Sequence, residues 1–262
     1  MSVLYSVISL AGLGLLFGVL ITFASKKFEV EQDDRVEKIV EILPNANCGG
    51  CGFAGCQAYA KAVVDGDAEP DLCSAGGTEA AAKIGEILGI EVGQKEPVTA
   101  YVMCCGSAEN TAPKYAYDGI DNCIAAVRVS GGFKSCSFAC LGFGNCVDAC
   151  KFDAISIQNG IAGVDTEKCV GCGACVKACP KALIHLVPKS AKYVVKCSSK
   201  DKGVDTKNNC KGGCIGCKIC EKNCPSDAIK VVDNLAVIDY SKCTSCGVCF
   251  EKCPRKIIKE KM

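Results

Sequence analysis

The chain opens with a long apolar stretch that carries no charge. Residues 3–24 are rich in Leu, Ile, Val, Gly and Phe, and no charged residue occurs from residue 2 to residue 25. As a helix, these 22 residues would extend about 33 Å, which is enough to cross the hydrocarbon core of a bilayer. A cleaved secretory signal fits less well, because no basic residue precedes the stretch and no A-x-A-like site follows it. The pattern predicts a single N-terminal transmembrane helix, with an anchor over residues 1–27.

The charges that flank this anchor predict its orientation. Lys26 and Lys27 follow the apolar stretch, whereas no Lys or Arg precedes it. By the positive-inside rule, the N-terminus then lies outside, and the chain from residue 26 onward lies on the cytoplasmic side. A reducing compartment also suits the many cysteines described below better than an oxidising one.

The pattern beyond the anchor predicts short helices and hairpins. Apolar positions within residues 33–43 share one helical face, and Pro44 ends this pattern. Apolar residues alternate with polar ones at residues 154–165 and 228–239, around an Asn-Gly pair and an Asp-Asn pair. Such alternation around a turn pair is typical of two strands joined by a tight turn. The predicted fold class is α+β.

Composition indicates what holds these short elements together. Of 262 residues, 25 are Cys, 1 is His and 6% are aromatic, so large aromatic cores are not expected. A disulfide scaffold is typical of shorter, secreted chains with an even number of cysteines. Zinc sites made of cysteine alone are a second alternative. The cysteine spacings match iron–sulfur ligation much better than either.

Three full copies of the bacterial ferredoxin signature, C-x-x-C-x-x-C-x-x-x-C-P, occur in the second half of the chain. Their cysteines are Cys169, Cys172, Cys175 and Cys179; Cys214, Cys217, Cys220 and Cys224; and Cys243, Cys246, Cys249 and Cys253. An irregular fourth copy precedes them, with the spacing C-x3-C-x5-C-x3-C and with Lys151 in place of the proline. Its cysteines are Cys136, Cys140, Cys146 and Cys150.

The four copies form two pairs, each with a predicted hairpin between its members. Cys150 precedes Cys169 by 19 residues, as Cys224 precedes Cys243 by 19 residues. We predict two tandem bacterial-type 2x4Fe–4S ferredoxin-like domains, over residues 133–188 and 210–262, in which the fourth cysteine of each copy ligates the other cluster. The predicted ligand sets are Cys136, Cys140, Cys146 and Cys179; Cys150, Cys169, Cys172 and Cys175; Cys214, Cys217, Cys220 and Cys253; and Cys224, Cys243, Cys246 and Cys249.

A different cysteine pattern follows the first short helix, in a small helical module predicted over residues 28–95. The cysteines of this pattern are Cys48, Cys51, Cys56 and Cys73. The first three lie among glycines, which leave backbone N–H groups free to point at sulfur. These four thiolates predict a further 4Fe–4S cluster, which makes five in all. The same glycines spell G-x-G-x-x-G, but no strand precedes them, so a dinucleotide site is not favoured.

Five cysteines remain outside these sets, and some lie in a predicted connecting segment (residues 96–132) or a predicted linker (residues 189–209). They are Cys104, Cys105, Cys123, Cys197 and Cys210. One interpretation is a sixth cluster held by Cys104, or its neighbour Cys105, together with Cys123, Cys197 and Cys210. The other interpretation is that these residues are buried apolar thiols, as free cysteines commonly are. The sequence does not decide between the two interpretations. The lone histidine, His185, is more typical of a structural residue than of a ligand.

Charge is balanced overall and uneven locally. The formal net charge is +1, which gives no sign of a nucleic-acid partner. Residues 189–222 hold nine lysines and three acidic residues, a local net charge of +6. This stretch could attract an acidic protein partner, but an ordinary solvated loop is the favoured interpretation. Lysines and carboxylates form no obvious catalytic constellation, so no catalytic residue is predicted.

The order of these features resembles a known family. An apolar helix, an acidic helix that ends Glu41-Ile-Leu-Pro44, the run C-G-x-C-G-x-x-x-C with a later cysteine, and the ferredoxin repeats follow one another as in the B subunits of the Rnf complex. The resemblance covers essentially the whole chain, and its first 75 residues are the most specific part. Shorter family members carry one two-cluster ferredoxin domain, whereas this chain carries two.

The resemblance implies a role for the chain. Rnf complexes are ion-translocating ferredoxin:NAD⁺ oxidoreductases of the bacterial inner (plasma) membrane, and their B subunits are iron–sulfur subunits of this translocase. Electrons from reduced soluble ferredoxin would then pass through the clusters to other Rnf subunits, which reduce NAD⁺ and move Na⁺ or H⁺. One alternative is a polyferredoxin-type electron-transfer subunit of another membrane complex of an anaerobe, such as a hydrogenase. A zinc-bound scaffold without redox work is a second alternative.

Overall fold

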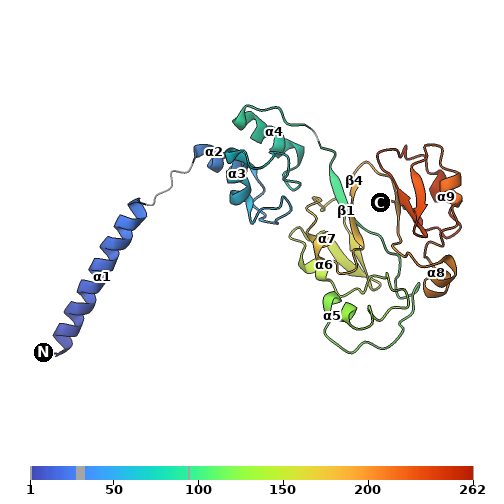
Figure 1. Ribbon diagram of the computed structural model, residues 1–262, viewed down its shortest axis with the longest axis horizontal. Coiled ribbons are helices and arrows are strands. Elements are labelled where there is room, and N and C mark those ends of the chain that lie inside the picture. The colour runs from blue at the N-terminus through green and yellow to red at the C-terminus, as the bar shows by residue number, and fades with distance from the viewer. Residues whose placement is uncertain (1, 28–32, 94, 262) are drawn as a thin grey trace.

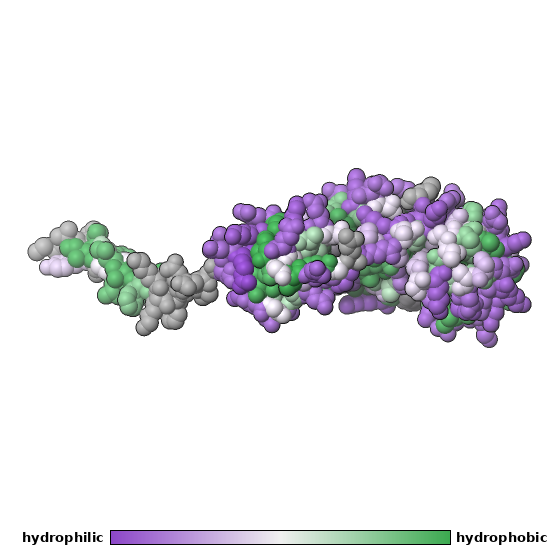
Figure 2. Space-filling model, turned by 90° about the horizontal axis from the view of Figure 1, so that it is seen from above, coloured by the Kyte–Doolittle hydropathy of each residue, from purple (hydrophilic) through white to green (hydrophobic). Residues whose placement is uncertain are grey.

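A computed structural model describes residues 2–27, 33–93 and 95–261 of the chain (Figure 1). The first helix, α1 (Ser2–Lys27), lies away from the rest of the molecule, and its described side chains are exposed. Figure 2 shows a mostly hydrophobic surface on α1, whereas hydrophilic side chains cover much of the remaining surface. Within the described residues, no helix combines the length and the hydropathy needed to cross a bilayer. The anchor over residues 1–27 therefore stays a prediction from the sequence.

Three helices build the part of the chain that we call the N-terminal module (residues 33–93). They are α2 (Asp34–Ile42), α3 (Cys56–Asp65) and α4 (Gly77–Leu88). The helix predicted over residues 33–43 is confirmed, and Asp33 caps it by accepting a hydrogen bond from the backbone N–H of Arg35 at 2.9 Å. The apolar faces of the helices meet in one core, whose least exposed members are Ile39, Tyr59 and Ile84.

Two antiparallel strand pairs and three short helices form what we call unit 1. Its strands are β1 (Val98–Val102), β2 (Ile155–Gln158), β3 (Ile161–Val164) and β4 (Ile184–Pro188). Its helices are α5 (Cys123–Arg128), α6 (Asn145–Asp148) and α7 (Ala174–Ala178). β2 pairs with β3, and β1 pairs with β4 in the register of Val98 against Pro188. β1 lies in the segment that the sequence predicted as a connection, residues 96–132.

Unit 2 repeats this plan at the C-terminal end of the chain. Its strands are β5 (Tyr193–Val195), β6 (Ile229–Val232), β7 (Leu235–Ile238) and β8 (Ile258–Glu260). Its helices are α8 (Gly203–Asn209), α9 (Ile219–Lys222) and α10 (Val248–Lys252). β6 pairs with β7, and β5 pairs with β8. β5 lies in the predicted linker, residues 189–209.

The structure confirms both predicted hairpins. Their turns place two consecutive residues at positive φ: Asn159 at 50° and Gly160 at 72°, and Asp233 at 48° and Asn234 at 63°. Positive φ at both central residues defines a type I′ turn, whose twist matches that of the strands it joins. Asn, Asp and Gly adopt this conformation more readily than other residues, so the local sequence sets both turns.

Cysteines take a large share of both unit interiors. The core of unit 1 contains Ala100, Leu183 and Ile184 together with the buried thiols of several cysteines. The core of unit 2 likewise surrounds Ile229 and Ile258 with cysteines. The thiols therefore face the interiors of these small units, where large aromatic side chains are scarce.

Candidate metal centres

All 25 cysteines of the chain have free thiols. Four cavities are each lined by at least four of them, and in each cavity cysteines from one short loop meet a cysteine that is distant in sequence. Four thiolates are the usual ligand set of a 4Fe–4S cluster, so these cavities are the candidate metal centres. In the described part of the chain, no group of three or more His, Cys, Asp or Glu side chains is placed to hold a single metal ion.

The cavity of the N-terminal module brings together the four cysteines predicted for it. They are Cys48, Cys51, Cys56 and Cys73. Asn47 fixes the loop, because its side-chain oxygen accepts a hydrogen bond from the backbone N–H of Cys56 at 2.9 Å. The N–H of Gly76 donates to Cys73 Sγ at 3.4 Å. Cys172 of unit 1 also lines this cavity, so the module lies directly against unit 1.

A second cavity, in unit 1, brings together one predicted set without change. Its cysteines are Cys150, Cys169, Cys172 and Cys175. The N–H of Ala100 on β1 donates to Cys169 Sγ at 3.3 Å. Burial raises the pKa of Cys175 to about 11, and the neighbouring sulfurs of this set act in the same direction. The strand β1 is therefore part of this centre and not a passive connection.

A third cavity, in unit 2, is lined by another predicted set, and the second set of this unit lies nearby. The cavity cysteines are Cys214, Cys217, Cys220 and Cys253. Burial raises the pKa of Cys249 to about 11, and the sulfurs that act on it after burial are those of Cys243, Cys224 and Cys246. These four belong to the second set predicted for unit 2.

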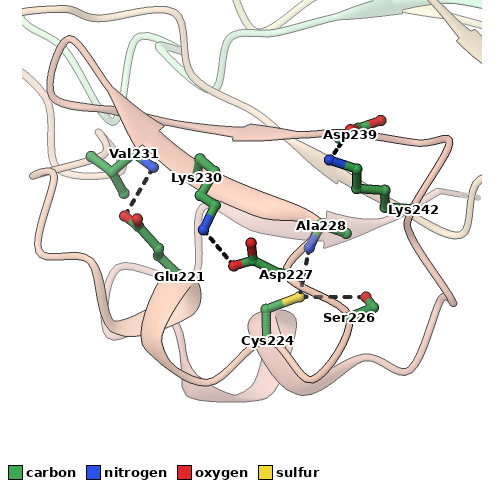
Figure 3. Close-up of polar contacts among 9 residues, drawn as sticks. All are labelled: Glu221, Cys224, Ser226, Asp227, Ala228, Lys230, Val231, Asp239 and Lys242. Carbon is green, nitrogen blue, oxygen red and sulfur yellow. Dashed lines mark hydrogen bonds and ion pairs between the residues drawn. The ribbon is translucent and has the colours of Figure 1, made fainter.

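Hydrogen bonds to the sulfur of Cys224 favour the form that binds metal (Figure 3). Its Sγ lies 3.6 Å from the hydroxyl of Ser226 and accepts a hydrogen bond from the N–H of Ala228 at 3.3 Å. Burial alone would raise the pKa of Cys224, but these hydrogen bonds outweigh burial and lower it. The thiolate, which is the form that binds metal, is thereby favoured.

The irregular motif is arranged differently from the predicted set. The fourth cavity is lined by Cys123, Cys140, Cys146 and Cys179, and Cys136 does not line it. Cys123 begins α5, and its backbone N–H donates to the side-chain oxygen of Asn145 at 2.6 Å, next to Cys146. The structure thus groups Cys123, and not Cys136, with the other three. The signal in the sequence was the spacing C-x3-C-x5-C, which departs from the ferredoxin repeat at this point.

The other five cysteines lie near the contacts that join unit 1 to unit 2, such as the hydrogen bonds from Thr111 to Asn209 and from Ser198 to Met103. They are Cys104, Cys105, Cys136, Cys197 and Cys210. Four are buried and Cys105 is half-buried. The only histidine, His185, lies on β4 with its side chain exposed.

The chain's own groups fit 4Fe–4S clusters. Backbone N–H groups point at sulfur in the N-terminal module, in unit 1 and in unit 2, and such hydrogen bonds help to set the reduction potential of a bound cluster. Each centre joins separate stretches of sequence, so a bound cluster would also hold its unit together. The fold and these centres define an iron–sulfur protein of the ferredoxin class, whose chemistry is one-electron transfer.

Comparison with known families gives the same class. Residues 43–75 match a family described as "Putative Fe-S cluster", residues 162–185 match a "4Fe-4S binding domain", and residues 213–257 match a "4Fe-4S dicluster domain". These three matches lie within the N-terminal module, unit 1 and unit 2, respectively.

Similar whole proteins identify the family. The chain is 47% identical to the B subunit of the Na(+)-translocating ferredoxin:NAD(+) oxidoreductase complex of Acetobacterium woodii, over 88% of this chain and 69% of that protein. It is 43% identical to the B subunit of the ion-translocating oxidoreductase complex of Methanosarcina acetivorans, over 91% of both chains. It is 42% identical to the B subunit of the proton-translocating ferredoxin:NAD(+) oxidoreductase complex of Clostridium ljungdahlii, over 88% of this chain and 82% of that protein. The chain belongs to the B subunits of the Rnf-type ion-translocating oxidoreductase complexes.

Proposed function

We propose that this protein is the electron-relay subunit of a membrane-bound ferredoxin:NAD⁺ oxidoreductase of the Rnf type. It accepts electrons from reduced soluble ferredoxin and passes them to the other Rnf subunits, which carry out NAD⁺ reduction and ion transfer. The observation that carries the proposal is the set of four cavities, each lined by at least four cysteines. Relatives at 42% and 47% identity whose names include ferredoxin:NAD(+) oxidoreductase support the choice of donor and acceptor.

The proposal assigns five 4Fe–4S clusters. One belongs to the N-terminal module, with Cys48, Cys51, Cys56 and Cys73. Unit 1 holds two, with Cys123, Cys140, Cys146 and Cys179, and with Cys150, Cys169, Cys172 and Cys175. Unit 2 holds two, with Cys214, Cys217, Cys220 and Cys253, and with Cys224, Cys243, Cys246 and Cys249. Cys123 replaces Cys136 because it lines the cavity with Cys140 and Cys146.

The proposal includes the membrane anchor predicted from the sequence. The uncharged stretch from residue 2 to residue 25 crosses the bacterial inner membrane, and Lys26 and Lys27 keep the rest of the chain on the cytoplasmic side. This location gives the clusters access to soluble ferredoxin and to the membrane subunits of the complex.

Metal analysis of the anaerobically purified complex tests the cofactor. We expect at least about twenty iron atoms and as many acid-labile sulfides per chain, since each cluster carries four of both. We also expect absorption near about 400 nm that bleaches on reduction, and low-potential 4Fe–4S signals in electron paramagnetic resonance after dithionite is added. Stoichiometric zinc with iron near zero would sink the proposal.

A single substitution tests the relay. In the purified complex, Cys51→Ala should remove one cluster, about four irons, and abolish NAD⁺ reduction by reduced ferredoxin, while the clusters of both ferredoxin-like units keep their signals. Loss of all iron in this variant, or unchanged NAD⁺ reduction, would contradict the relay as proposed.

A further inference from the structure

The junction between units 1 and 2 holds five thiols that the five proposed clusters do not use. Cys104, Cys105 and Cys136 come from unit 1, and Cys197 and Cys210 come from unit 2. Cys104, Cys136, Cys197 and Cys210 are 5% to 9% exposed, so the four thiols are inside the protein. These five thiols come from four separate segments of the chain, so the fold gathers them in one place, and this arrangement needs an explanation.

We propose that Cys104, Cys136, Cys197 and Cys210 hold a sixth 4Fe–4S cluster at this junction. The proposal rests on the proposed function, because it assumes that the chain is loaded with iron–sulfur clusters. It differs from the set expected from the sequence in one position, since Cys136 takes the place of Cys123. The two residues exchange roles: Cys123 completes a centre inside unit 1, and Cys136 faces unit 2.

Hydrogen bonds between the units bring the four cysteines together. The hydroxyl of Thr111 donates to the carbonyl of Asn209, next to Cys210, at 2.7 Å. The same hydroxyl accepts from the backbone N–H of Cys136 at 3.4 Å. Thr111 is 3% exposed, so it joins the Cys136 and Cys210 segments inside the protein.

A second bond joins the other two segments. The hydroxyl of Ser198, next to Cys197, donates to the carbonyl of Met103, next to Cys104, at 2.9 Å. Cys104, Cys136 and Cys210 also belong to one cluster of buried side chains.

The backbone around these cysteines matches that of the assigned ligands. The N–H of Gly106 donates to Cys104 Sγ at 3.3 Å, and the N–H of Ser199 donates to Cys197 Sγ at 3.4 Å. In both cases the donor lies two residues after the cysteine. Assigned ligands also accept hydrogen bonds from nearby backbone N–H groups, as Cys73 Sγ does from Gly76 at 3.4 Å.

Cys105 behaves differently from its neighbour and is not one of the four. Its thiol donates a hydrogen bond to the carbonyl of Gly212 at 3.1 Å. A thiol that donates to a carbonyl keeps its proton, whereas a metal binds the thiolate. Cys105 therefore stays outside the proposed ligand set.

A buried positive charge beside the junction points independently to an anionic group. Lys134 is 5% exposed, and its Nζ donates to the carbonyls of Gly106 and Gly160 at 2.8 Å each. No ion pair found among the described residues includes it, although a buried ammonium without a counter-charge is costly. Its partner Gly106 lies two residues after Cys104, and Lys134 itself lies two residues before Cys136. Thiolates bound to an iron–sulfur cluster at this place would supply the missing negative charge.

The proposed site lies between a centre of unit 1 and a centre of unit 2. Cys104 Sγ accepts a hydrogen bond from the N–H of Cys140, a ligand in unit 1, at 3.4 Å. Cys197 Sγ accepts one from the N–H of Cys214, a ligand in unit 2, at 3.3 Å. These contacts lead from a centre of unit 1 to a centre of unit 2. A cluster bound here would supply one-electron transfer between the two units.

Iron and sulfide counts on the anaerobically prepared full-length chain test the proposal. We expect about twenty-four irons and about twenty-four sulfides in the unaltered chain, and a loss of about four of each in Cys197→Ser. The matched control is Cys105→Ser, which should keep the full count. An unaltered chain with about twenty irons would overturn the sixth cluster and leave the proposed function standing. This count does not depend on whether Cys197→Ser folds. One zinc per chain that disappears in Cys197→Ser would overturn it as well.

Double substitutions test which cysteines share the site. Cys136→Ser combined with Cys197→Ser should lose about four irons, no more than either change alone, because both residues bind the same cluster. Cys123→Ser combined with Cys197→Ser should lose about eight, because these residues bind different clusters. A loss of about eight irons in the Cys136 and Cys197 double variant, and of about four in the Cys123 and Cys197 double variant, would give the opposite result. It would place Cys123 at the junction and overturn the assignment of Cys136.

Discussion

At the scale of single residues, the chain adjusts each sulfur through the groups that contact it. The sulfur of Cys224 is the clearest case, because a hydroxyl and a backbone N–H both contact it (Figure 3). Hydrogen bonds to sulfur favour the more negative, reduced state of a cluster, so they raise its reduction potential. Side-chain donors can be removed by substitution, whereas backbone donors cannot.

Removal of the Ser226 hydroxyl should make the potential of the Cys224 cluster more negative. Ser226→Ala deletes the contact to Cys224 Sγ and leaves the N–H of Ala228 in place. We expect a shift of roughly 20 to 40 mV, the equivalent of part of one hydrogen bond to a charged group. A redox titration followed by electron paramagnetic resonance measures it. Ser190→Ala, at an exposed serine remote from Cys224 in sequence, is the control, and an equal shift there would refute the interpretation.

Substitution of Lys134 should act on the same property through charge. Lys134→Met keeps an unbranched side chain, one atom shorter, but removes the buried ammonium that donates to the carbonyl of Gly106, two residues after Cys104. A reduced cluster loses more from this change than an oxidised one, so the potential of the nearest clusters should fall by several tens of mV, roughly 1 kcal/mol. Lys207→Met, on the exposed surface of α8, is the control and should change no potential. A rise in potential in Lys134→Met would contradict the argument.

At the scale of elements, the sequence predicts those features that depend only on residues close together in the chain. The ferredoxin repeats predict ligand sets because three cysteines of each set lie within one short segment. Both type I′ turns follow from two adjacent residues. The helix α2 follows from its apolar face and its cap at Asp33. In each case the information lies within about ten residues, so it is visible without the fold.

Long-range contacts mark the limit of that prediction. The pairing of β1 with β4 joins residues such as Val102 and Ile184, and neither segment carries a signal for the other. The proposed exchange of Cys123 and Cys136 has the same origin. It depends on the hydrogen bond from Cys123 to Asn145 and on the contact of Cys136 with Thr111, and neither bond follows from cysteine spacing.

The cysteine loop and the hairpin turn of unit 1 fit closely together, and one glycine makes this possible. A Cβ at Gly142 would lie 2.6 Å from the carbonyl oxygen of Gly160, and Gly142 has a φ of +79°. Gly142→Ala should therefore lower the stability of unit 1 by about 3 kcal/mol, from backbone strain and overpacking together. The shift of the thermal unfolding midpoint under anaerobic conditions measures it.

The matched control for this change lies in the same unit. Gly163 is on β3, and a Cβ there would lie 4.0 Å from the nearest atom found, the carbonyl oxygen of Ser156. Gly163→Ala should leave the midpoint almost unchanged. Equal destabilisation by the two substitutions would show that the close contact at Gly142 is not what limits the unit.

At the scale of the whole molecule, contacts between the centres follow the order of the chain. The N-terminal module meets unit 1 where a Cβ at Gly50 would lie 2.6 Å from the carbonyl oxygen of Cys172. Hydrogen bonds such as that from Thr111 to Asn209 join unit 1 to unit 2. Figure 1 shows α1 at one end of this arrangement and unit 2 at the other. The exposed cysteines, Cys217 and Cys246, both belong to unit 2.

This arrangement predicts where the soluble donor binds. A donor must bring its own cluster close to a cluster of the chain, and unit 2 has the ligands nearest to solvent. Exposed lysines surround them, among them Lys218 next to Cys217 and Lys222 at the end of α9. An acidic ferredoxin would be steered to such a surface, and salt would weaken the attraction. We therefore expect the basic stretch to take part in docking.

Charge reversal at this surface should slow the delivery of electrons. In the complex, Lys218→Glu combined with Lys222→Glu should lower the second-order rate of reduction by ferredoxin about tenfold at low ionic strength, and less as salt is added. The control pair is Lys38→Glu with Lys61→Glu on the exposed surface of the N-terminal module. Stopped-flow absorbance near about 400 nm follows the reaction. An equal effect of both pairs would show that the net charge of the chain, and not a local docking surface, sets the rate. A rate that does not depend on salt would place the docking surface elsewhere.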